Sequence, residues 1–495
     1  MGVIRFLIDS PNRLTPAAVQ RAYFSGPDYI PWPTRARQTL DGLEVDRESN
    51  ESGNFHILWH VPRHGELMLT TSTLAERGKP YWLAVELARG ELFRLRTQVA
   101  EWQELGLVLP RVVYAALEQA TKLFARAATQ QYLPNEVEPL AERALIAALE
   151  TGQQLVACFV EQALAGRKRH TPKLPTWLGA SLGNRPVDRS IGRRLMSSFN
   201  AAAMTCNWHE IEAVEGAYRW EAYDQQIDWC QSHDAKIIAG PLLKFSQGAL
   251  PDWLYLWSGD FDNLLSVITD YVETTVTRYR GRVQLWNCAA RLAEPDILGL
   301  SEEQRFQLAV RVVEIVRKLD PETPAVISFD QPWGEYLHRS RLELAPLTLA
   351  DALVRSELGL GGIAVECNVG YSPGGSASRD LLAYNRLIDW WGSFGLPLYV
   401  YVTFPSAATM DPLSRKPAHV AVEAHPQGAS PAGQLAWVEQ FVSLLVAKPA
   451  VRGVFWNQLS DAEPHDFPHG GLIDATGDSK PALNALGAIR RQHLA

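Results

Sequence analysis

From about residue 178 onward, short apolar runs alternate with longer amphipathic segments. We expect strands in the short runs, at 178–181, 197–203, 236–239, 283–286, 325–329, 362–367, 398–403 and 453–456. Apolar residues recur at helical spacing between them, for example over 264–279, 303–319 and 379–394. About eight strand–helix units in roughly 315 residues predict an α/β fold, a closed (β/α)8 TIM barrel. An open doubly wound sheet is the alternative, but no glycine-rich phosphate turn follows the first strand.

The chain before the predicted barrel shows two other patterns. Short runs at 3–8, 55–59, 67–71 and 81–87 are separated by turn-forming residues, which predicts a β-sandwich-like module over 1–104. Apolar residues then recur at helical spacing on both sides of Pro134-Asn135, which predicts an α-hairpin within 105–170. A basic stretch with two prolines at 166–175 predicts a linker with a solvated surface, and the barrel occupies 178–495.

The composition excludes several classes of protein. The chain has 55 acidic and 47 basic side chains, a net charge of −8, which argues against nucleic acid as a partner. Its five cysteines form no CxxC pair, and the histidines of 465–469 flank a proline in a predicted loop, so we expect no metal site and no cofactor. No secretory signal and no run of about 18 apolar residues is visible, which predicts a cytoplasmic protein without a membrane partner, unless export is non-classical. The oligomeric state is left open.

Polar and aromatic side chains gather at the predicted carboxyl ends of the barrel strands, where the active sites of this fold lie. Three carboxylates stand there, Asp330, Glu366 and Asp461. Rings that stack on sugar faces, beside amides and acids that bind hydroxyls, are typical of a carbohydrate site. The substrate-binding residues are therefore predicted to include Trp286, Asn287, Gln331, Trp333, Asn368 and Trp456. Alternatively, Trp286 and Trp456 belong to the barrel core.

Several short motifs follow one another along the barrel region. They are Phe199-Asn200, Trp208 with Glu212 and Glu215–Tyr218, Leu250–Trp253, Tyr279–Val283, Asp320-Pro321, Gly395–Pro397, Phe455-Trp456, Gly471–Asp474 and Lys480–Ala482. In these motifs and their order, residues 178–495 resemble the family 10 glycoside hydrolases, which are xylanase-type eight-stranded barrels. The resemblance implies an endo-1,4-β-xylanase-like hydrolase fold, with a β-linked, xylan-type polysaccharide or oligosaccharide as partner.

Two positions depart from the family pattern. The family's general acid/base is a Glu directly after an Asn at the fourth strand, and here Cys288 follows Asn287. The family's nucleophile, a Glu on the seventh strand, aligns with Val402. Retaining hydrolysis requires two carboxyl groups about 5–5.5 Å apart, which a thiol and an isopropyl group do not supply. We therefore expect glycan recognition with both usual catalytic residues replaced.

One acid stands where the family pattern has none. At the sixth strand the family has Gln and, two residues on, His, whereas this chain has Glu366 and Asn368. In one hypothesis Glu366 acts with Asp330 or Asp461 as an active O-glycosyl hydrolase, by inversion if the carboxyls lie about 6.5–9.5 Å apart. In another, Glu366 binds sugar hydroxyls or supports Asn287 without catalysis. A third hypothesis is a non-catalytic structural or interaction protein.

Overall fold

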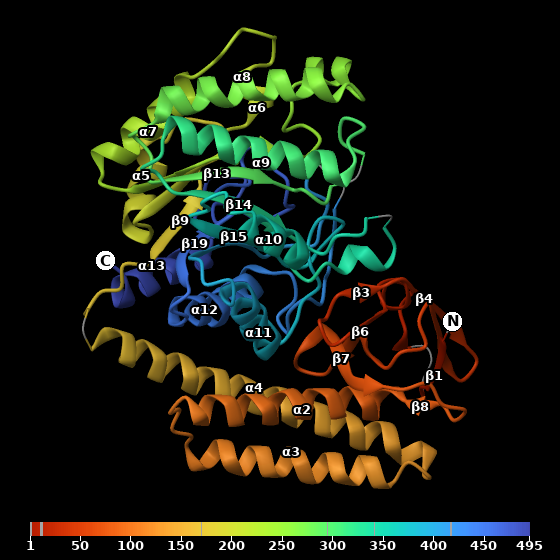
Figure 1. Ribbon diagram of the computed structural model, residues 1–495. Helices are drawn as coiled ribbons and strands as arrows, with labels where there is room; N and C mark the ends of the chain where they lie inside the picture. Colours follow the sequence, from red (N-terminus) through yellow and green to blue (C-terminus); the bar gives the residue numbers. More distant parts are fainter. Residues whose placement is uncertain (1, 10–12, 170, 295, 341, 416–417) are drawn as a thin grey trace.

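Eight parallel strands close into the predicted barrel in the computed structural model, which describes residues 2–9, 13–169, 171–294, 296–340, 342–415 and 418–495 (Figure 1). The barrel closes because the last strand pairs with the first, with Val454 opposite Leu178. The strands are β9 (Trp177–Ser181), β10 (Ala201–Met204), β11 (Lys236–Ala239), β13 (Leu285–Ala290), β14 (Ala325–Asp330), β15 (Gly362–Asn368), β17 (Leu398–Thr403) and β19 (Val451–Trp456). The predicted (β/α)8 fold is confirmed.

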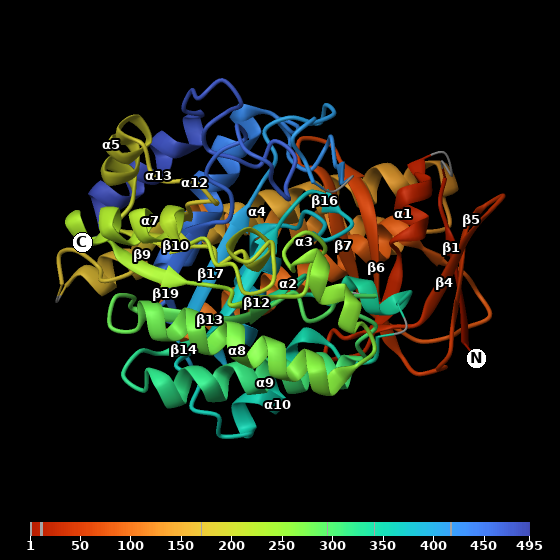
Figure 2. The ribbon, with the colours of Figure 1, turned by 90° about the horizontal axis from the view of Figure 1, so that it is seen from above.

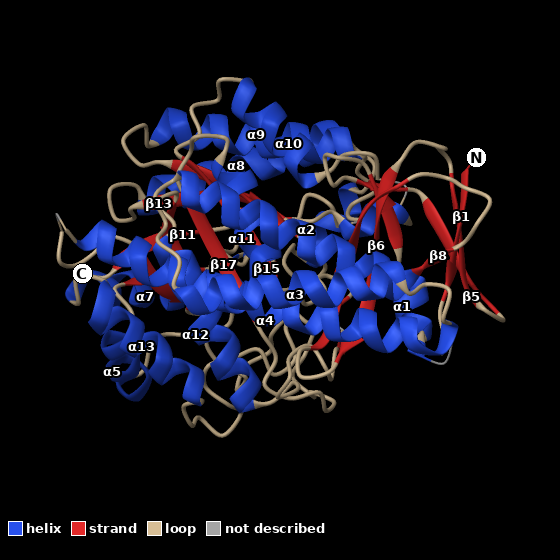
Figure 3. Cartoon of the chain, turned by 90° about the horizontal axis from the view of Figure 1, so that it is seen from below, coloured by secondary structure: helices blue, strands red, loops and turns tan. Residues whose placement is uncertain are grey.

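Helices surround these strands, as Figure 3 shows in blue around red. They are α5 (Arg189–Ser198), α6 (Trp208–Ile211), α7 (Glu221–Ser232), α8 (Phe261–Tyr279), α9 (Glu302–Leu319), α10 (Pro346–Arg355), α11 (Leu381–Gly392), α12 (Pro431–Ala447) and α13 (Pro481–His493), with 3-10 turns at Asp252–Trp257 and Glu335–His338. Local chemistry sets their ends: Ser301 and Gln304 form a capping box that starts α9. In the described part of the barrel region, three two-residue strands occur in addition to the eight barrel strands. They are β12 (Leu243–Lys244), β16 (Tyr371–Ser372) and β18 (His419–Val420).

The second barrel strand begins later than predicted. Residues 197–198 end helix α5, and the strand covers Ala201–Met204. The fourth strand likewise runs on to Ala290, four residues past its predicted end. Short apolar runs next to helices fit either structure, so pattern alone does not fix such boundaries.

Two four-stranded sheets form the β-rich N-terminal region beside the barrel (Figure 2). One sheet has the order β4 (Thr34–Thr39), β5 (Gly42–Arg47), β1 (Gly2–Leu7), β8 (Tyr81–Trp82), and the other β3 (Pro31–Trp32), β2 (Tyr23–Ser25), β6 (Gly53–Val61), β7 (Gly65–Leu74). A short helix, α1 (Pro16–Gln20), lies between β1 and β2. The two sheets share one apolar core, in which the rings of Phe6 and Phe55 stack at 4.7 Å.

The strand predicted at 81–87 is wrong beyond residue 82. Helix α2 (Leu83–Glu104) begins there, and it packs with α3 (Arg111–Thr129) and α4 (Pro134–Lys168). The helical region is therefore a three-helix layer rather than a hairpin alone (Figure 1). Helix α2 forms because Leu95, Val99 and Trp102 recur at helical spacing and line one buried helix face. The strand was predicted because the apolar run at 81–85 also fits a strand.

Helix α4 is 35 residues long and connects this layer to the barrel. Within the described residues it is the one helix whose length and apolarity would suffice to cross a membrane, but 44% of its most apolar window is buried inside the protein. It packs on α2, α3, α11 and α12, which accounts for its apolar surface.

The basic stretch that begins in the last turn of α4 is not simply a solvated linker. Arg167, in the last turn of α4, donates to the carbonyl oxygens of Val446 and Lys448, where α12 ends. Lys168 donates to the carbonyl of Gln492 at 2.9 Å, in the last turn of α13. These cations satisfy carbonyls that helix ends leave without partners.

Backbone hydrogen bonds join the N-terminal sheets to loops of the barrel. Met68 N–H donates to the carbonyl of Ser378 at 2.8 Å, and Glu66 N–H to that of Glu423 at 2.7 Å. A buried ion pair between Arg379 and Glu335, with Arg21 at 2.9 Å from the same carboxylate, lies at this contact. The N-terminal region thus supports the loops that follow β15 and β17.

Candidate functional site

A cleft opens at the carboxyl ends of the barrel strands. It has an empty volume of about 1360 Å³, part of it open to solvent. Successive side chains of a strand point to opposite faces, so every second residue of a barrel strand reaches the interior. The strand residues that line the base of the cleft include Asn287, Ser328, Glu366 and Tyr401, with Asn457 just after β19.

The guanidinium of Arg291 lies between two of the predicted acids. Its Nη2 is 3.3 Å from Glu366 Oε2, and its Nε is 3.8 Å from Asp330 Oδ2. Asp330 and Glu366 are register neighbours on β14 and β15. Because both carboxylates contact one guanidinium, they lie within about 10 Å of each other. The structure therefore brings these two predicted residues together.

Burial and charge act against each other in this cluster. Burial raises the pKa of Asp330, and Glu366 adds to the rise, while Arg291 opposes it. Burial lowers the pKa of Arg291, but the carboxylates of Glu366 and Asp330 outweigh burial and raise it overall. Among the described residues, Glu366 lines the cleft and Asp330 does not. Of the two strand carboxylates, Glu366 is therefore the one that a ligand in the cleft can contact. The permanently charged guanidinium of Arg291 lies beside it.

Two amides complete the polar base of the cleft around Glu366. Its Oε2 accepts from Asn368 Nδ2 at 3.0 Å and from Asn457 Nδ2 at 3.3 Å. Asn457 Nδ2 also lies 3.1 Å from Asn368 Oδ1. This network fixes the orientation of the carboxylate, and Glu366 and Asn457 line the cleft.

Asn287 reaches the same cleft from β13. Its Nδ2 donates to Ser328 Oγ at 2.8 Å, while its buried Oδ1 has no hydrogen-bond partner in the described part of the chain. A buried acceptor without a partner costs free energy, which a ligand hydroxyl would recover. The predicted role of Asn287 as a binding residue is therefore consistent with its position.

A second charged cluster forms one wall of the cleft. Lys244 Nζ lies 2.6 Å from Asp466 Oδ2, and Arg415 Nη1 lies 3.9 Å from Asp466 Oδ1. Burial raises the pKa of Asp466, but Lys244, Arg291 and Arg415 together hold it well below its usual range. Phe467 packs under the Arg291 guanidinium at 5.5 Å.

The prediction that Trp286 and Trp456 bind substrate is wrong. Trp286 is fully buried in the outer core, and its Nε1 donates to Asp320 Oδ2 at 2.9 Å. Trp456 is buried against Trp437 and donates to the carbonyl of Gly470 at 2.8 Å. Both follow the strand alternation that turns their neighbours Asn287 and Asn457 inward and the indoles outward.

Gln331 and Trp333 also lie outside the cleft lining in the described chain. Gln331 Nε2 lies 3.4 Å from Asp330 Oδ2, so it contacts the acid cluster from the side. Trp333 stacks against the Arg379 guanidinium at 4.1 Å, next to the N-terminal sheets. The prediction of direct substrate contact is not supported for either residue.

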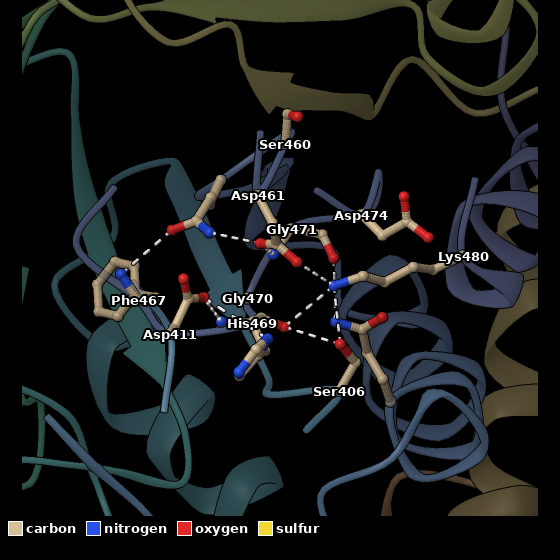
Figure 4. A network of polar contacts seen from close by, with 12 residues as sticks. Ser406, Asp411, Ser460, Asp461, Phe467, His469, Gly470, Gly471, Asp474 and Lys480 are labelled. Atoms are coloured by element: carbon tan, nitrogen blue, oxygen red, sulfur yellow. Dashed lines mark hydrogen bonds and ion pairs between the residues drawn. The ribbon is translucent and has the colours of Figure 1, made fainter. Parts of the chain in front are cut away.

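Asp461 is a structural anchor rather than a member of the acid cluster. Its Oδ1 accepts from Gln458 Nε2 at 2.8 Å and from Gly471 N–H at 2.6 Å, and its Oδ2 accepts from Lys480. Figure 4 shows the Lys480 ammonium pointing at Asp461, with Ser406 and the His469 carbonyl around it. With every oxygen engaged and no place in the described lining of the cleft, Asp461 is not available as a catalytic acid.

The side chains of Cys288 and Val402 point away from the barrel interior. Both are fully buried in the apolar core between strands and helices. On β17 the flanking Tyr401 belongs instead to the barrel interior. A carboxylate placed at either position on this backbone would not reach the cleft. This geometry does not test the alignment that equates Cys288 and Val402 with the family's catalytic residues. Their assignment as replaced catalytic residues stays a prediction.

Sequence reasoning missed Arg291, Tyr401, Lys244 and Arg415. Arg291 follows a register irregularity between Asn287 and Ala289 and has a left-handed backbone, with φ of 63°. Such a conformation is uncommon for a non-glycine residue and often marks a functional site, but sequence does not reveal it. The Tyr401-Val402 alternation was a usable signal, because it places only one of the two residues inward.

No group of three or more histidine, cysteine, aspartate or glutamate side chains within the described ranges is arranged to hold a metal ion.

Comparison with known proteins gives a match over part of the barrel. Residues 181–298 match the family model described as glycosyl hydrolase family 10. Endo-1,4-beta-xylanase 2 of Claviceps purpurea is 29% identical over 85 residues, which are 17% of this chain and 25% of that protein. Endo-1,4-beta-xylanase B of Thermotoga neapolitana is 28% identical over 80 residues, 16% of this chain and 22% of that protein. The matched region thus spans about a quarter of these relatives.

A solved structure is also similar to this chain. Native xylanase 10B from Thermotoga maritima covers 67% of this chain and 97% of its own, at 14% identity and a TM-score of 0.49.

Proposed function

We propose that this protein binds a β-linked, xylan-type oligosaccharide or polysaccharide in the cleft, and the match of residues 181–298 to the model of glycosyl hydrolase family 10 supports this. The usual retaining hydrolysis is not part of the proposal. The curated relatives are endo-1,4-beta-xylanases, which supports the choice of ligand. The cleft lies at the strand ends where this fold places its active sites.

The observation that carries the proposal is the amide and carboxylate base of the cleft. Glu366 is held by Asn368 and Asn457, and Asn287 lines the cleft beside them. Paired sugar hydroxyls both donate and accept hydrogen bonds, so a fixed carboxylate next to amide groups suits them. The ring of Tyr401 adds an aromatic edge beside these groups.

Retaining hydrolysis is disfavoured by what the strands present. It needs a second carboxyl group about 5–5.5 Å from the first, on the opposite side of the scissile bond. The candidate partner Asp330 is buried behind Arg291, on the neighbouring strand to Glu366. Both acids therefore stand on the same side of the cleft base.

Hydrolysis by relocated carboxylates is the second candidate, and one observation favours it. Burial raises the pKa of Asp330, as a general acid requires, and Glu366 lies within about 10 Å through the shared Arg291. In this mechanism Glu366 would activate water, and Asp330 could protonate the leaving oxygen only if Arg291 moved aside, because Asp330 does not line the cleft within the described residues. Asp461 has no part in it, because Lys480 and Gly471 occupy its oxygens.

Binding and turnover are measured separately. Isothermal titration calorimetry with xylotriose to xylohexaose, on wild type and the Glu366→Gln and Asn457→Ala variants, tests binding. Matched controls are Glu303→Gln on α9 and Asn263→Ala on α8, both on the exposed surface. We expect binding by wild type and both controls, and about tenfold weaker binding by the two cleft variants, the effect of losing one charge-assisted hydrogen bond.

Release of reducing ends from xylan and aryl xylosides measures turnover. No release supports binding without catalysis, whereas release that Glu366→Gln abolishes establishes the hydrolase. Absence of both binding and turnover would instead support a structural or interaction role.

A further inference from the structure

Among the residues that the structure describes, four cationic side chains line the cleft, although the protein as a whole is acidic. They are Arg185, Lys244, Arg291 and Arg415, against three acids, Glu366, Glu463 and Asp466. Four positive and three negative charges give the cleft a net charge of +1, within a chain of net charge −8. Binding a neutral sugar requires none of these cations, because amides and carboxylates suffice for hydroxyls.

The two outer arginines are mounted on fixed backbone. Gln226, fully buried on α7, donates to the carbonyl oxygens of Gly183 at 3.1 Å and Arg185 at 2.7 Å, which holds the loop after β9. The N–H of Arg415 donates to the carbonyl of His465 at 2.8 Å, which joins the loop after β17 to the loop after β19. The backbone of both arginines is therefore fixed on the cleft wall, which limits the region that each guanidinium group can reach.

Neither outer arginine is close enough to its acidic neighbour for a hydrogen bond. Arg185 Nε lies 3.9 Å from Glu463 Oε1, and Arg415 Nη1 lies 3.9 Å from Asp466 Oδ1. Lys244, in contrast, contacts Asp466 at 2.6 Å. A guanidinium has five donors in a planar fork that matches the two oxygens of an anion. Two such forks on the wall of a sugar cleft are suited to an anionic substituent.

We propose that the cleft takes a glycan that carries an anionic group, a carboxylate or a sulfate ester, and that Arg185 and Arg415 bind this group. The inference rests on the proposed function and narrows its substrate class. The local field supports it, because Lys244, Arg291 and Arg415 lower the pKa of Asp466 strongly against the effect of burial. An anion entering beside Asp466 meets the same cations.

The test compares three probes by isothermal titration calorimetry: neutral xylohexaose, a uronic acid-substituted xylo-oligosaccharide and a sulfated xylo-oligosaccharide. The proteins are wild type, Arg185→Gln, Arg415→Gln, the double variant and Arg415→Lys. Arg311→Gln on α9 is the matched control, because Arg311 is a half-exposed arginine outside the cleft lining that pairs with Glu314 at 3.4 Å. Thermal melting confirms that each variant is folded.

We expect wild type to bind one or both anionic probes about tenfold more tightly than xylohexaose, with a preference that falls as salt is raised from about 50 to about 500 mM. The double variant loses this preference and binds xylohexaose within about twofold of wild type, while Arg415→Lys keeps the salt dependence but loses part of the affinity. The anionic probe that wild type favours identifies the carboxylate or the sulfate as the bound group.

Equal affinity for neutral and anionic probes overturns this inference alone and leaves the proposed function intact. A preference that persists in the double variant also overturns it. Failure of all three probes to bind contradicts the proposed function, and the inference with it.

Discussion

The Lys480→Met substitution tests whether Asp461 is a structural anchor. Lys480 and Asp461 are both buried, and the ammonium uses its three donors on Asp461, on Ser406 Oγ at 2.7 Å and on the His469 carbonyl at 3.2 Å. These hydrogen bonds join the loop after β17 to the chain that follows β19. Methionine keeps most of the side-chain volume but removes the charge and all three hydrogen bonds.

The magnitude follows from what Asp461 retains. Removing one partner of a buried ion pair costs about 3–5 kcal/mol, because the other charge stays buried. Here the Asp461 carboxylate keeps two donors, Gln458 Nε2 and Gly471 N–H. We therefore expect a loss near the lower limit, about 3 kcal/mol of the free energy of unfolding.

Urea denaturation followed by tryptophan fluorescence measures this loss. Lys122→Met is the matched control, because Lys122 pairs with Glu118 on the exposed surface of α3, where solvent screens the pair and its loss changes stability little. The double variant Asp461→Asn with Lys480→Met should recover part of the loss, since no unpaired charge remains. A loss below about 1 kcal/mol, or one equal to that of Lys122→Met, would refute the anchor.

Three further predictions concern single buried side chains. Cys288→Glu should destabilise the protein by about 3 kcal/mol or more and restore no release of reducing ends, because the side chain points into the outer core; xylanase activity in this variant would contradict the orientation. Trp286→Phe should cost about 1–3 kcal/mol, measured in urea, because Asp320 loses its donor, while oligosaccharide affinity stays unchanged; weaker binding would return Trp286 to the site. Burial raises the pKa of Glu91 from 4.5 to about 7, although the buried ion pair with Arg94 opposes the rise, so the folded state favours the protonated form. The resulting stability is present below pH 4.5 and lost as the pH rises through about 7. Relative to Glu91→Gln, wild type should therefore lose about 3 kcal/mol across this window in urea titrations, and parallel pH profiles would exclude the effect.

Much of the fold could be predicted because its signals are local. The strands at Lys236–Ala239 and Leu398–Thr403 match the predicted limits, since a buried parallel strand is a short apolar run between turn residues. Helix α2 was missed because the apolar run at 81–85 fits both a strand and a helix start, and the choice depends on packing against α4.

The candidate site was predictable as a region but not residue by residue. The strand ends were located to within one residue except on the fourth strand, which runs four residues further, and Glu366, Asn368 and Asn287 are part of the cleft base or its support. The inward or outward direction depends on register within about one residue, so the prediction placed both Trp286 and its neighbour Asn287 in the site, although only Asn287 faces the cleft. Arg291 contacts Glu366, which lies 75 positions further along the chain, and a single sequence gives no signal for such a long-range contact.

The affinity of the cleft for a xylo-oligosaccharide tests most directly whether the cleft binds a xylan-type glycan. Titration of xylohexaose into wild type and into Asn457→Ala, with Asn263→Ala as control, addresses the cleft itself rather than the family resemblance. We expect binding by wild type and by the control, and about tenfold weaker binding by Asn457→Ala. Wild type that binds no oligosaccharide, or an Asn457→Ala variant that binds as tightly as wild type, would contradict this expectation.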